Sequence, residues 1–248
     1  MNLTENTILI TGGGSGIGRG LAEAFHKLGN RVIIAGRRAD VLAEVVAANP
    51  GMDQMVLDIE DASSIPGFAQ KMLTAHPSLN ILINNAGIMR AEDMLAEPYD
   101  LTDAEAMVAI NFLGPIRLTA ALLQHLKAQP KAAVLTVSSG LAFVPLAMTP
   151  TYSATKAAVH SWSQSLRHQL RSTPVEVIEI APPAVATDLM PRSRSNPMAQ
   201  QLDDYIAEVM SLLAKGGAEI LVERVKRLRE AESSGQYYGV FEALNPPG

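Results

Sequence analysis

The sequence predicts an α/β fold in which about seven parallel strands form one doubly wound sheet, with helices on both of its faces. Short apolar runs rich in β-branched residues alternate with longer segments of helical spacing along almost all of the 248 residues. A cluster of glycines directly follows the first run. No Pro- or Ser-rich linker and no internal repeat divides the chain. We therefore expect a single domain over residues 1–248.

The apolar runs have the length of buried strands, and right-handed crossovers between parallel strands place helices on both faces of a sheet. In the first predicted helix, Leu21, Phe25 and Leu28 fall on one face, and Gly29 ends the pattern. The predicted strands cover residues 7–11, 31–35, 54–58, 80–84, 132–138, 175–181 and 218–222.

Composition excludes several classes of protein. The net charge of −5 gives no reason to expect nucleic acid or an anionic membrane as a partner. The chain has no cysteine, and its five histidines lack metal-ligand spacing, so we predict no metal site. No signal peptide is visible, and the longest uncharged stretch, residues 132–155, contains two prolines and many hydroxyls. We expect a cytoplasmic protein.

The stretch TGGGSGIG, residues 11–18, connects the first predicted strand to the first predicted helix. Its glycines at 12, 16 and 18 permit a sharp turn and let a diphosphate approach the free N–H groups of the helix N-terminus. The absence of Gly-Lys-Ser/Thr excludes a P-loop. A methyltransferase also places glycines after its first strand, so that alternative remains open at this point.

Two arginines, Arg37 and Arg38, end the second predicted strand about 20 residues beyond the glycine turn. A dinucleotide-binding fold places an acidic side chain there when it binds NAD, and an arginine when it accommodates the 2′-phosphate of NADP. No carboxylate precedes Asp40. The pair therefore predicts a preference for NADP over NAD, because guanidinium and phosphate form charge-assisted hydrogen bonds.

The pentapeptide YSATK places Tyr152 and Lys156 four residues apart in a long helical pattern. On a helix they share a face, and a nearby ammonium favours the phenolate. We expect Lys156 to lower the tyrosine pKa towards the operating pH, as general acid–base catalysis requires. Taken alone, a Tyr–Lys pair at this spacing is more often an ordinary surface pair.

Five motifs in order and spacing resemble the short-chain dehydrogenase/reductase family over essentially the full chain: TGGGSGIG, NNAG (84–87), the asparagine of AINFLGP, VSS (137–139) and YSATK. SGLAFVPLA, LRHQL, VEVIE and PPAV resemble its DltE-type subgroup. The resemblance implies a Rossmann-like fold and an NAD(P)-dependent oxidoreductase that transfers a hydride between the nicotinamide and a carbonyl or secondary alcohol. It also implies a homodimer or homotetramer.

The resemblance implies roles for individual residues. Tyr152 exchanges the substrate proton, Lys156 supports it and contacts the nicotinamide ribose, Ser139 holds the carbonyl oxygen, and Asn111 anchors a water leading to Lys156. Pro182 is followed by Pro183 where most of the family has Pro-Gly, which predicts a stiffened nicotinamide loop. The implied cofactor contacts are Gly12, Ser15, Gly16, Ile17, Gly18, Arg37, Arg38, Asp58, Ile59, Asn85, Ala86, Gly87, Tyr152, Lys156, Pro182, Val185 and Thr187.

Other segments have more than one interpretation. Residues 190–215 begin with an irregular, Pro- and Arg-containing stretch and are predicted to include a substrate lid. Residues 223–248 form a predicted helical tail whose apolar stripe packs on its own subunit or joins a subunit interface. Leu141 and Phe143 are either packing residues or substrate contacts.

The rival interpretation of the whole chain is a nucleotide-binding sensor or scaffold without turnover. The intact set of Asn111, Ser139, Tyr152 and Lys156 argues against it, because a protein without catalysis has no physical need for all four. A methyltransferase would not require the Tyr–Lys pair, so it becomes the more distant alternative.

Overall fold

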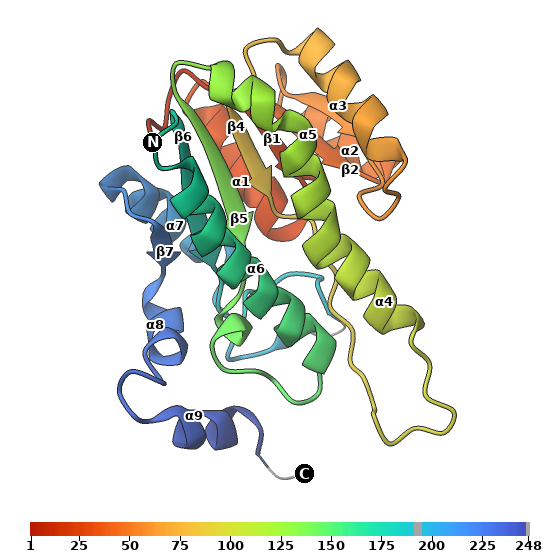
Figure 1. Cartoon of the computed structure of the whole chain (residues 1–248), viewed down its shortest axis with the longest axis vertical. Helices are drawn as coiled ribbons and strands as arrows, with labels where there is room; N and C mark the ends of the chain where they lie inside the picture. The colour runs from red at the N-terminus through yellow and green to blue at the C-terminus, as the bar shows by residue number, and fades with distance from the viewer. Residues whose placement is uncertain (191–194, 247–248) are drawn as a thin grey trace.

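The computed structural model describes residues 1–190 and 195–246. Its strands form one parallel sheet in the order β3-β2-β1-β4-β5-β6-β7 (Figure 1). This confirms the predicted fold class. The strands are β1 (Thr7–Thr11), β2 (Arg31–Gly36), β3 (Asp53–Val56), β4 (Ile81–Asn84), β5 (Ala132–Val137), β6 (Val175–Ala181) and β7 (Glu219–Leu221).

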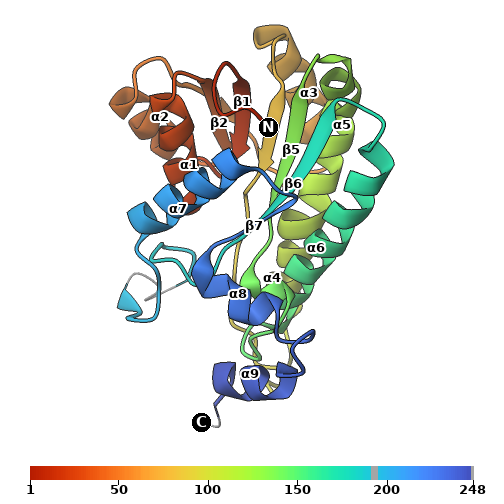
Figure 2. The same cartoon turned by 90° about the vertical axis from the view of Figure 1, so that its left-hand side faces the viewer.

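Helices cover both faces of the sheet. On one face α1 (Gly16–Lys27), α2 (Ala39–Ala48) and α7 (Leu202–Lys215) pack in a core with Ile8 and Ile10. On the other face α3 (Ser64–Ala75), α5 (Gly114–Ala128) and α6 (Pro150–Leu170) pack in a second core with Leu9. Figure 2 shows α1, α2 and α7 on one side of the strands and α5 and α6 on the other. Burial on both faces explains why β1 reads as a continuous apolar run.

The predicted face of α1 is right for two of its three residues. Leu21 and Phe25 are fully buried, whereas Leu28 is 43% exposed. The helix ends at Lys27, and Gly29 adopts φ +82° to turn the chain towards β2. Leu28 therefore lies beyond the helical period that would have carried it into the core.

The sheet has its switch point between β1 and β4. From β1 the chain proceeds outwards to β2 and β3, whereas β4 is followed by β5, β6 and β7 on the other side. The loops after β1 and β4 therefore diverge and leave a crevice at the carboxyl ends of the strands. Asn85 Nδ2 donates to Thr11 O at 2.9 Å across this point, which joins the NNAG turn to the glycine turn.

A long helix crosses the second face. The segments α4 (Thr102–Val108), η1 (Ala109–Leu113) and α5 run on continuously, and η1 is a π turn that contains Asn111. Among the described residues, Thr102–Ala128 is the one helix long and apolar enough to cross a membrane. Its buried residues Leu118, Leu122 and Leu126 belong to the core beneath the sheet. Packing against the sheet accounts for its apolar character.

The C-terminal segment packs on its own chain. After β7 come α8 (Glu223–Arg229) and α9 (Tyr237–Leu244); α9 lies at the lower end of the molecule, and α8 lies between β7 and α9 (Figures 1 and 2). Val225 joins the main core, and a small separate core gathers around Val144, Ala231 and Val240. The remaining stripe residues, Leu228, Tyr237, Phe241 and Leu244, pack against that small core. A subunit interface for the tail stays a prediction.

Candidate active site

A cavity of about 1090 Å³ opens at the carboxyl ends of the strands. This volume lies just above the range of about 300–1,000 Å³ for small-molecule sites. Most residues expected from the sequence lie in its wall. They are Gly12, Ser15, Gly16, Ile17, Gly18, Arg37, Arg38, Ile59, Asn85, Ala86, Gly87, Ser139, Tyr152, Lys156, Pro182, Val185 and Thr187.

Three candidates lie outside the cavity wall. The Asp58 side chain is exposed, and its carboxylate accepts a hydrogen bond from Glu60 N at 3.1 Å. Asn111 is buried behind the wall. Leu141 lines the cavity, whereas Phe143 packs its ring against His160 and under the Arg229 guanidinium.

The glycines let this turn pack closely against the NNAG turn, where a side chain would collide with the protein's own atoms. A Cβ on Gly12, which has φ +67°, would lie 2.9 Å from Ala86 Cα. A Cβ on Gly18 would overlap Asn85 Nδ2 and Gly12 O. The first turn of α1 contains no acidic residue, and no side chain caps its N-terminus. These features fit a diphosphate held by backbone donors and the helix dipole.

Arg37 and Arg38 also line the cavity. Arg37 follows β2, and its Nη1 lies 3.6 Å from Glu60 Oε2 with the side chain about half exposed. Arg38 is the N-cap residue of α2 and is exposed. Both guanidinium groups have enough freedom to turn towards a phosphate beside the glycine turn.

Tyr152 and Lys156 project from the first turns of α6 and are buried. Pro150 starts this helix, where its missing N–H costs no hydrogen bond. Lys156 Nζ lies 5.5 Å from the centroid of the Tyr152 ring and donates to Val137 O at 2.8 Å. Ser139 follows β5, and its Oγ accepts a hydrogen bond from Leu141 N at 3.1 Å. The fold therefore brings Ser139, Tyr152 and Lys156 together in one cavity.

The pKa of Tyr152 differs from the value that the sequence predicts. Burial raises the pKa of Tyr152 to about 12, and the hydrogen bond with Ser139 opposes this rise. Burial also lowers the pKa of Lys156 to about 8, against the attraction of Glu179. The prediction that Lys156 lowers the tyrosine pKa is wrong for this structure, because the ammonium faces Val137 O and desolvation of the phenol dominates. Tyr152 is a neutral phenol at neutral pH and therefore a proton donor.

Asn111 holds the walls of the site together. Its Oδ1 accepts from Ile88 N and its Nδ2 donates to Ile88 O, both at 2.9 Å. The same Nδ2 donates to Thr155 Oγ1 at 3.2 Å on α6. Gly87 keeps this region open, since a Cβ there would lie 3.3 Å from Asn111 Oδ1 and 3.6 Å from Lys156 Nζ. π turns recur at functional sites, but no residue spacing in the sequence predicts this one.

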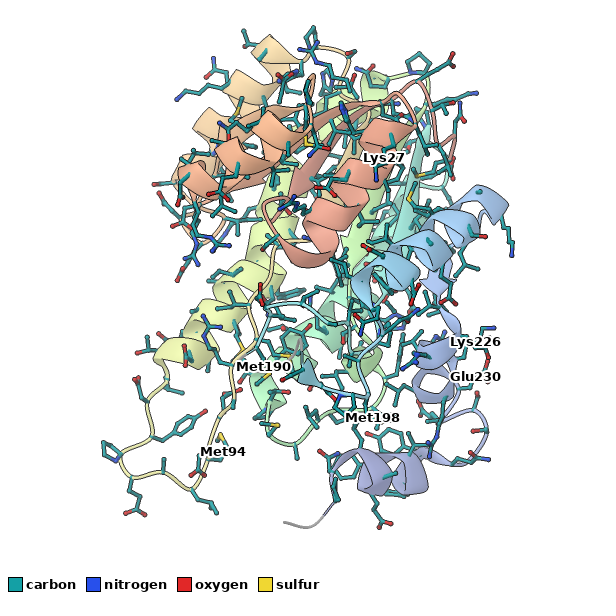
Figure 3. The ribbon with its side chains drawn as sticks, turned by 180° about the vertical axis from the view of Figure 1, so that it is seen from behind. Lys27, Met94, Met190, Met198, Lys226 and Glu230 are labelled. Atoms are coloured by element: carbon teal, nitrogen blue, oxygen red, sulfur yellow. The ribbon has the colours of Figure 1, made fainter. Side chains whose placement is uncertain are left out.

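The irregular segment between β6 and α7 borders the cavity. Met190 and Met198 line it, and Figure 3 labels both on this segment. Residues 191–194 of the predicted lid lie outside the described residues. The second half of the predicted lid region forms α7, whose Tyr205 and Val209 are fully buried in the core. The part of this region that meets the cavity is therefore its first half.

Sequence reasoning missed two features of the site. Leu228 and Leu244 of the tail line the cavity. Glu179 on β6 is buried and touches Ser138 and His160. A signal for Glu179 exists, because it lies deep within the apolar run VEVIEIA of a covered parallel strand, whereas Glu176 lies at the start of the strand and reaches solvent.

Comparison with known proteins agrees with this geometry. Residues 6–198 match the family model for short chain dehydrogenase. The chain is 43% identical to the uncharacterized oxidoreductase DltE of Bacillus subtilis, over 99% of this chain and 98% of the relative.

Two solved structures share the fold. A short chain dehydrogenase from Burkholderia cenocepacia in complex with NADP superimposes with a TM-score of 0.86, at 24% identity and with all of both chains covered. A short chain dehydrogenase/reductase from Burkholderia phymatum in complex with NAD gives a TM-score of 0.82 at 20% identity, covering 100% of this chain and 98% of the other. With the family match over most of its length, this chain belongs to the short-chain dehydrogenase/reductase family and is a DltE-like oxidoreductase.

Proposed function

We propose that the protein is an NADP-preferring reductase of carbonyl compounds that also oxidises the corresponding secondary alcohols. The observation that carries the proposal is the shared cavity, in which Ser139, Tyr152 and Lys156 face the same space as the glycine turn and Arg37. A diphosphate-binding turn and a buried proton donor in one cavity are what hydride transfer to a carbonyl requires.

The side chains have distinct roles in this reaction. The nicotinamide cofactor supplies the hydride when bound. Tyr152 donates its phenolic proton to the carbonyl oxygen; the phenol is protonated at neutral pH, although its raised pKa makes it a weaker acid than a free tyrosine. Ser139 donates a hydrogen bond to the same oxygen and stabilises the charge that develops there. Lys156 places a cation beside the phenol, and Asn111 fixes the neighbouring backbone.

The proposed cofactor contacts follow the cavity wall from the glycine turn to the segment after β6. Arg37 and Arg38 pair with the 2′-phosphate, which accounts for the preference for NADP. Pro182, Val185 and Thr187 lie on the segment that follows β6 and are assigned to the nicotinamide end. Asp58, exposed beside the cavity, is assigned to the adenine end through its backbone neighbour Ile59, which lines the wall.

The substrate end of the cavity is apolar. The segment after Ser139 contributes Leu141, Leu146 and Met148, and the tail contributes Leu228 and Leu244. We infer a small-molecule substrate whose carbonyl is flanked by apolar groups, since these side chains offer such groups a dry surface. By analogy with the family, the active form is a cytoplasmic homodimer or homotetramer.

The test is NADPH consumption by the purified protein with a panel of aldehydes, ketones and quinones that includes matched apolar and carboxylate-bearing members. The proposal expects turnover with the apolar members and faster turnover with NADPH than with NADH at equal concentration. Tight NADPH binding without turnover of any member would favour a sensor or scaffold. Equal rates with both cofactors would contradict the assigned preference.

A further inference from the structure

Strand β6 carries a carboxylate in the interior of the protein. Glu179 is 1% exposed, whereas the other glutamate of this strand, Glu176, is an exposed partner of the N-terminal amine. Taking a carboxylate out of water is costly unless hydrogen bonds and opposite charges compensate for the lost hydration. The position of Glu179 therefore calls for a physical explanation.

Both oxygens of Glu179 are engaged, and each partner belongs to a catalytic element. Oε1 accepts a hydrogen bond from the hydroxyl of Ser138, the residue directly before Ser139. Oε2 lies 2.7 Å from His160 Nδ1, and His160 comes one helical turn after Lys156 on α6. Glu179 thus connects the end of β5, which presents Ser139, to the helix that presents Lys156.

The Lys156 ammonium lies beside the end of β5 that Glu179 contacts through Ser138. Its Nζ donates to the carbonyl of Val137, the neighbour of Ser138, and the negative charge of Glu179 favours the protonated ammonium against the effect of burial. Among the described residues, no carboxylate is close enough to form a direct ion pair with Lys156. The influence of Glu179 is therefore that of a nearby buried charge in a poorly screened environment.

The remaining charged groups around Glu179 come from α6, β7 and α8. His160 presents Nδ1 to Glu179 from α6, and Glu219 lies nearby on β7. One side-chain nitrogen or oxygen atom from each of these three residues lies within 4.8 Å of the other two. Arg229 on α8 is attracted to Glu179 but forms its ion pair with Glu219, at 2.8 Å. Arg167 on α6 also acts on Glu219. Arg229 forms its ion pair with Glu219. The cation on the cavity side whose protonated form Glu179 favours is therefore Lys156.

We propose that Glu179 is a positioning residue of the active site, which holds Lys156 in its charged form and fixes α6 against the strand end that presents Ser139. The proposal rests on the catalytic role assigned above to Lys156. It goes beyond the four-residue set of Asn111, Ser139, Tyr152 and Lys156, because Glu179 touches neither substrate nor cofactor and acts through Lys156.

The test removes the charge while keeping the size of the side chain. In Glu179→Gln, the basic limb of the pH profile of kcat/KM is expected to move to lower pH by about one unit. At pH values above this limb kcat/KM should therefore fall roughly tenfold, and at lower pH it should change little. Glu179→Asp keeps the charge but moves it away from Lys156, and is expected to shift the basic limb in the same direction by less than Glu179→Gln does. If Glu179→Gln does not fold, the profile of Glu179→Asp still decides, because its displaced charge should move the limb in the same direction by less.

A matched control is Glu219→Gln, which removes the other carboxylate of the cluster but faces Arg229 and not Ser138. Its basic limb is expected to stay within about 0.3 unit of the wild type. A limb that stays in place in both Glu179 variants, or that moves as far in Glu219→Gln, would overturn the proposal.

A second readout does not depend on turnover. NMR titration of 13C-labelled lysine, with the Lys156 signal identified from Lys156→Met, reports the ionisation of this ammonium directly. The titration midpoint is expected to fall by about one unit in Glu179→Gln. If the midpoint falls in Glu179→Gln but the wild-type protein reduces no carbonyl, the role of Glu179 is supported and the proposed function is refuted. If the midpoint is unchanged in Glu179→Gln and the wild type is an active reductase, the proposed function is supported and the role of Glu179 is refuted.

Discussion

Replacing Gly18 by alanine tests whether the glycine turn is built for a ligand. A Cβ at this position would overlap the amide nitrogen of Asn85 and the carbonyl oxygen of Gly12. Neither atom moves freely, because Asn85 Nδ2 donates to Thr11 O at 2.9 Å and Gly12 O belongs to the backbone of the turn. The turn must therefore open to accept a single methyl group.

The structure allows an order-of-magnitude cost. Overpacking costs about 1–3 kcal/mol, and the weakened Asn85 hydrogen bond costs about 1 kcal/mol more. The higher helix propensity of alanine returns about 1 kcal/mol, which leaves a net loss of about 2 kcal/mol. For a chain of this size the melting temperature should fall by about 4–8 °C. The opened turn should also weaken NADPH binding by about tenfold or more, since the donors no longer converge on the diphosphate.

The control is Gly67→Ala in α3, where no heavy atom beyond the adjoining backbone of the helix lies within 4 Å of the added Cβ. This variant is expected to gain up to about 1 kcal/mol of stability and to bind NADPH as the wild type does. Calorimetry gives both melting temperatures, and titration monitored by NADPH fluorescence gives both dissociation constants. Wild-type stability and NADPH affinity in Gly18→Ala would refute the reasoning.

Two further predictions concern charge. Arg37→Asp should weaken NADPH binding by about 10- to 100-fold while sparing NADH, because a charge-assisted contact with the 2′-phosphate is lost; equal losses for both cofactors would rule out that contact. The pKa of Lys156 falls from 10.5 to about 8 on folding, so the folded state binds fewer protons than the unfolded chain between these values. Relative to Lys156→Met, the free energy of unfolding of the wild type should therefore rise from pH 8 to pH 10.5, and a flat difference in denaturant titrations would contradict the burial of a charged lysine.

The sheet was predictable because its strands are covered on both faces and their apolar content is continuous. Five of the six residues of β2 and all five of β1 are buried or nearly so, and both strands were located to within a residue. The edge strand β3 alternates between exposed and half-buried residues, and its observed end at Val56 precedes the predicted one. An edge strand is defined by pairing on one side, which residue types specify weakly.

The candidate site was predictable where its residues are close in sequence or follow strand ends. The glycine turn and the Tyr152–Lys156 pair are local patterns, and strand ends of a parallel sheet meet at one edge. Glu179, His160 and Arg229 come from three elements, and only the packed fold shows that they converge. The orientation of Lys156 towards Val137 O also depends on tertiary packing, which is why the expected effect on the Tyr152 pKa was wrong.

The most direct test of the central claim compares NADPH oxidation by the wild type and by Tyr152→Phe with the same carbonyl substrate. The phenylalanine ring keeps the packing of Tyr152 but has no proton to donate. Turnover is expected to fall by about 100- to 10,000-fold while NADPH affinity stays near that of the wild type. Turnover at the wild-type rate in Tyr152→Phe would contradict the assignment of Tyr152 as the proton donor, and with it the mechanism proposed for this cavity.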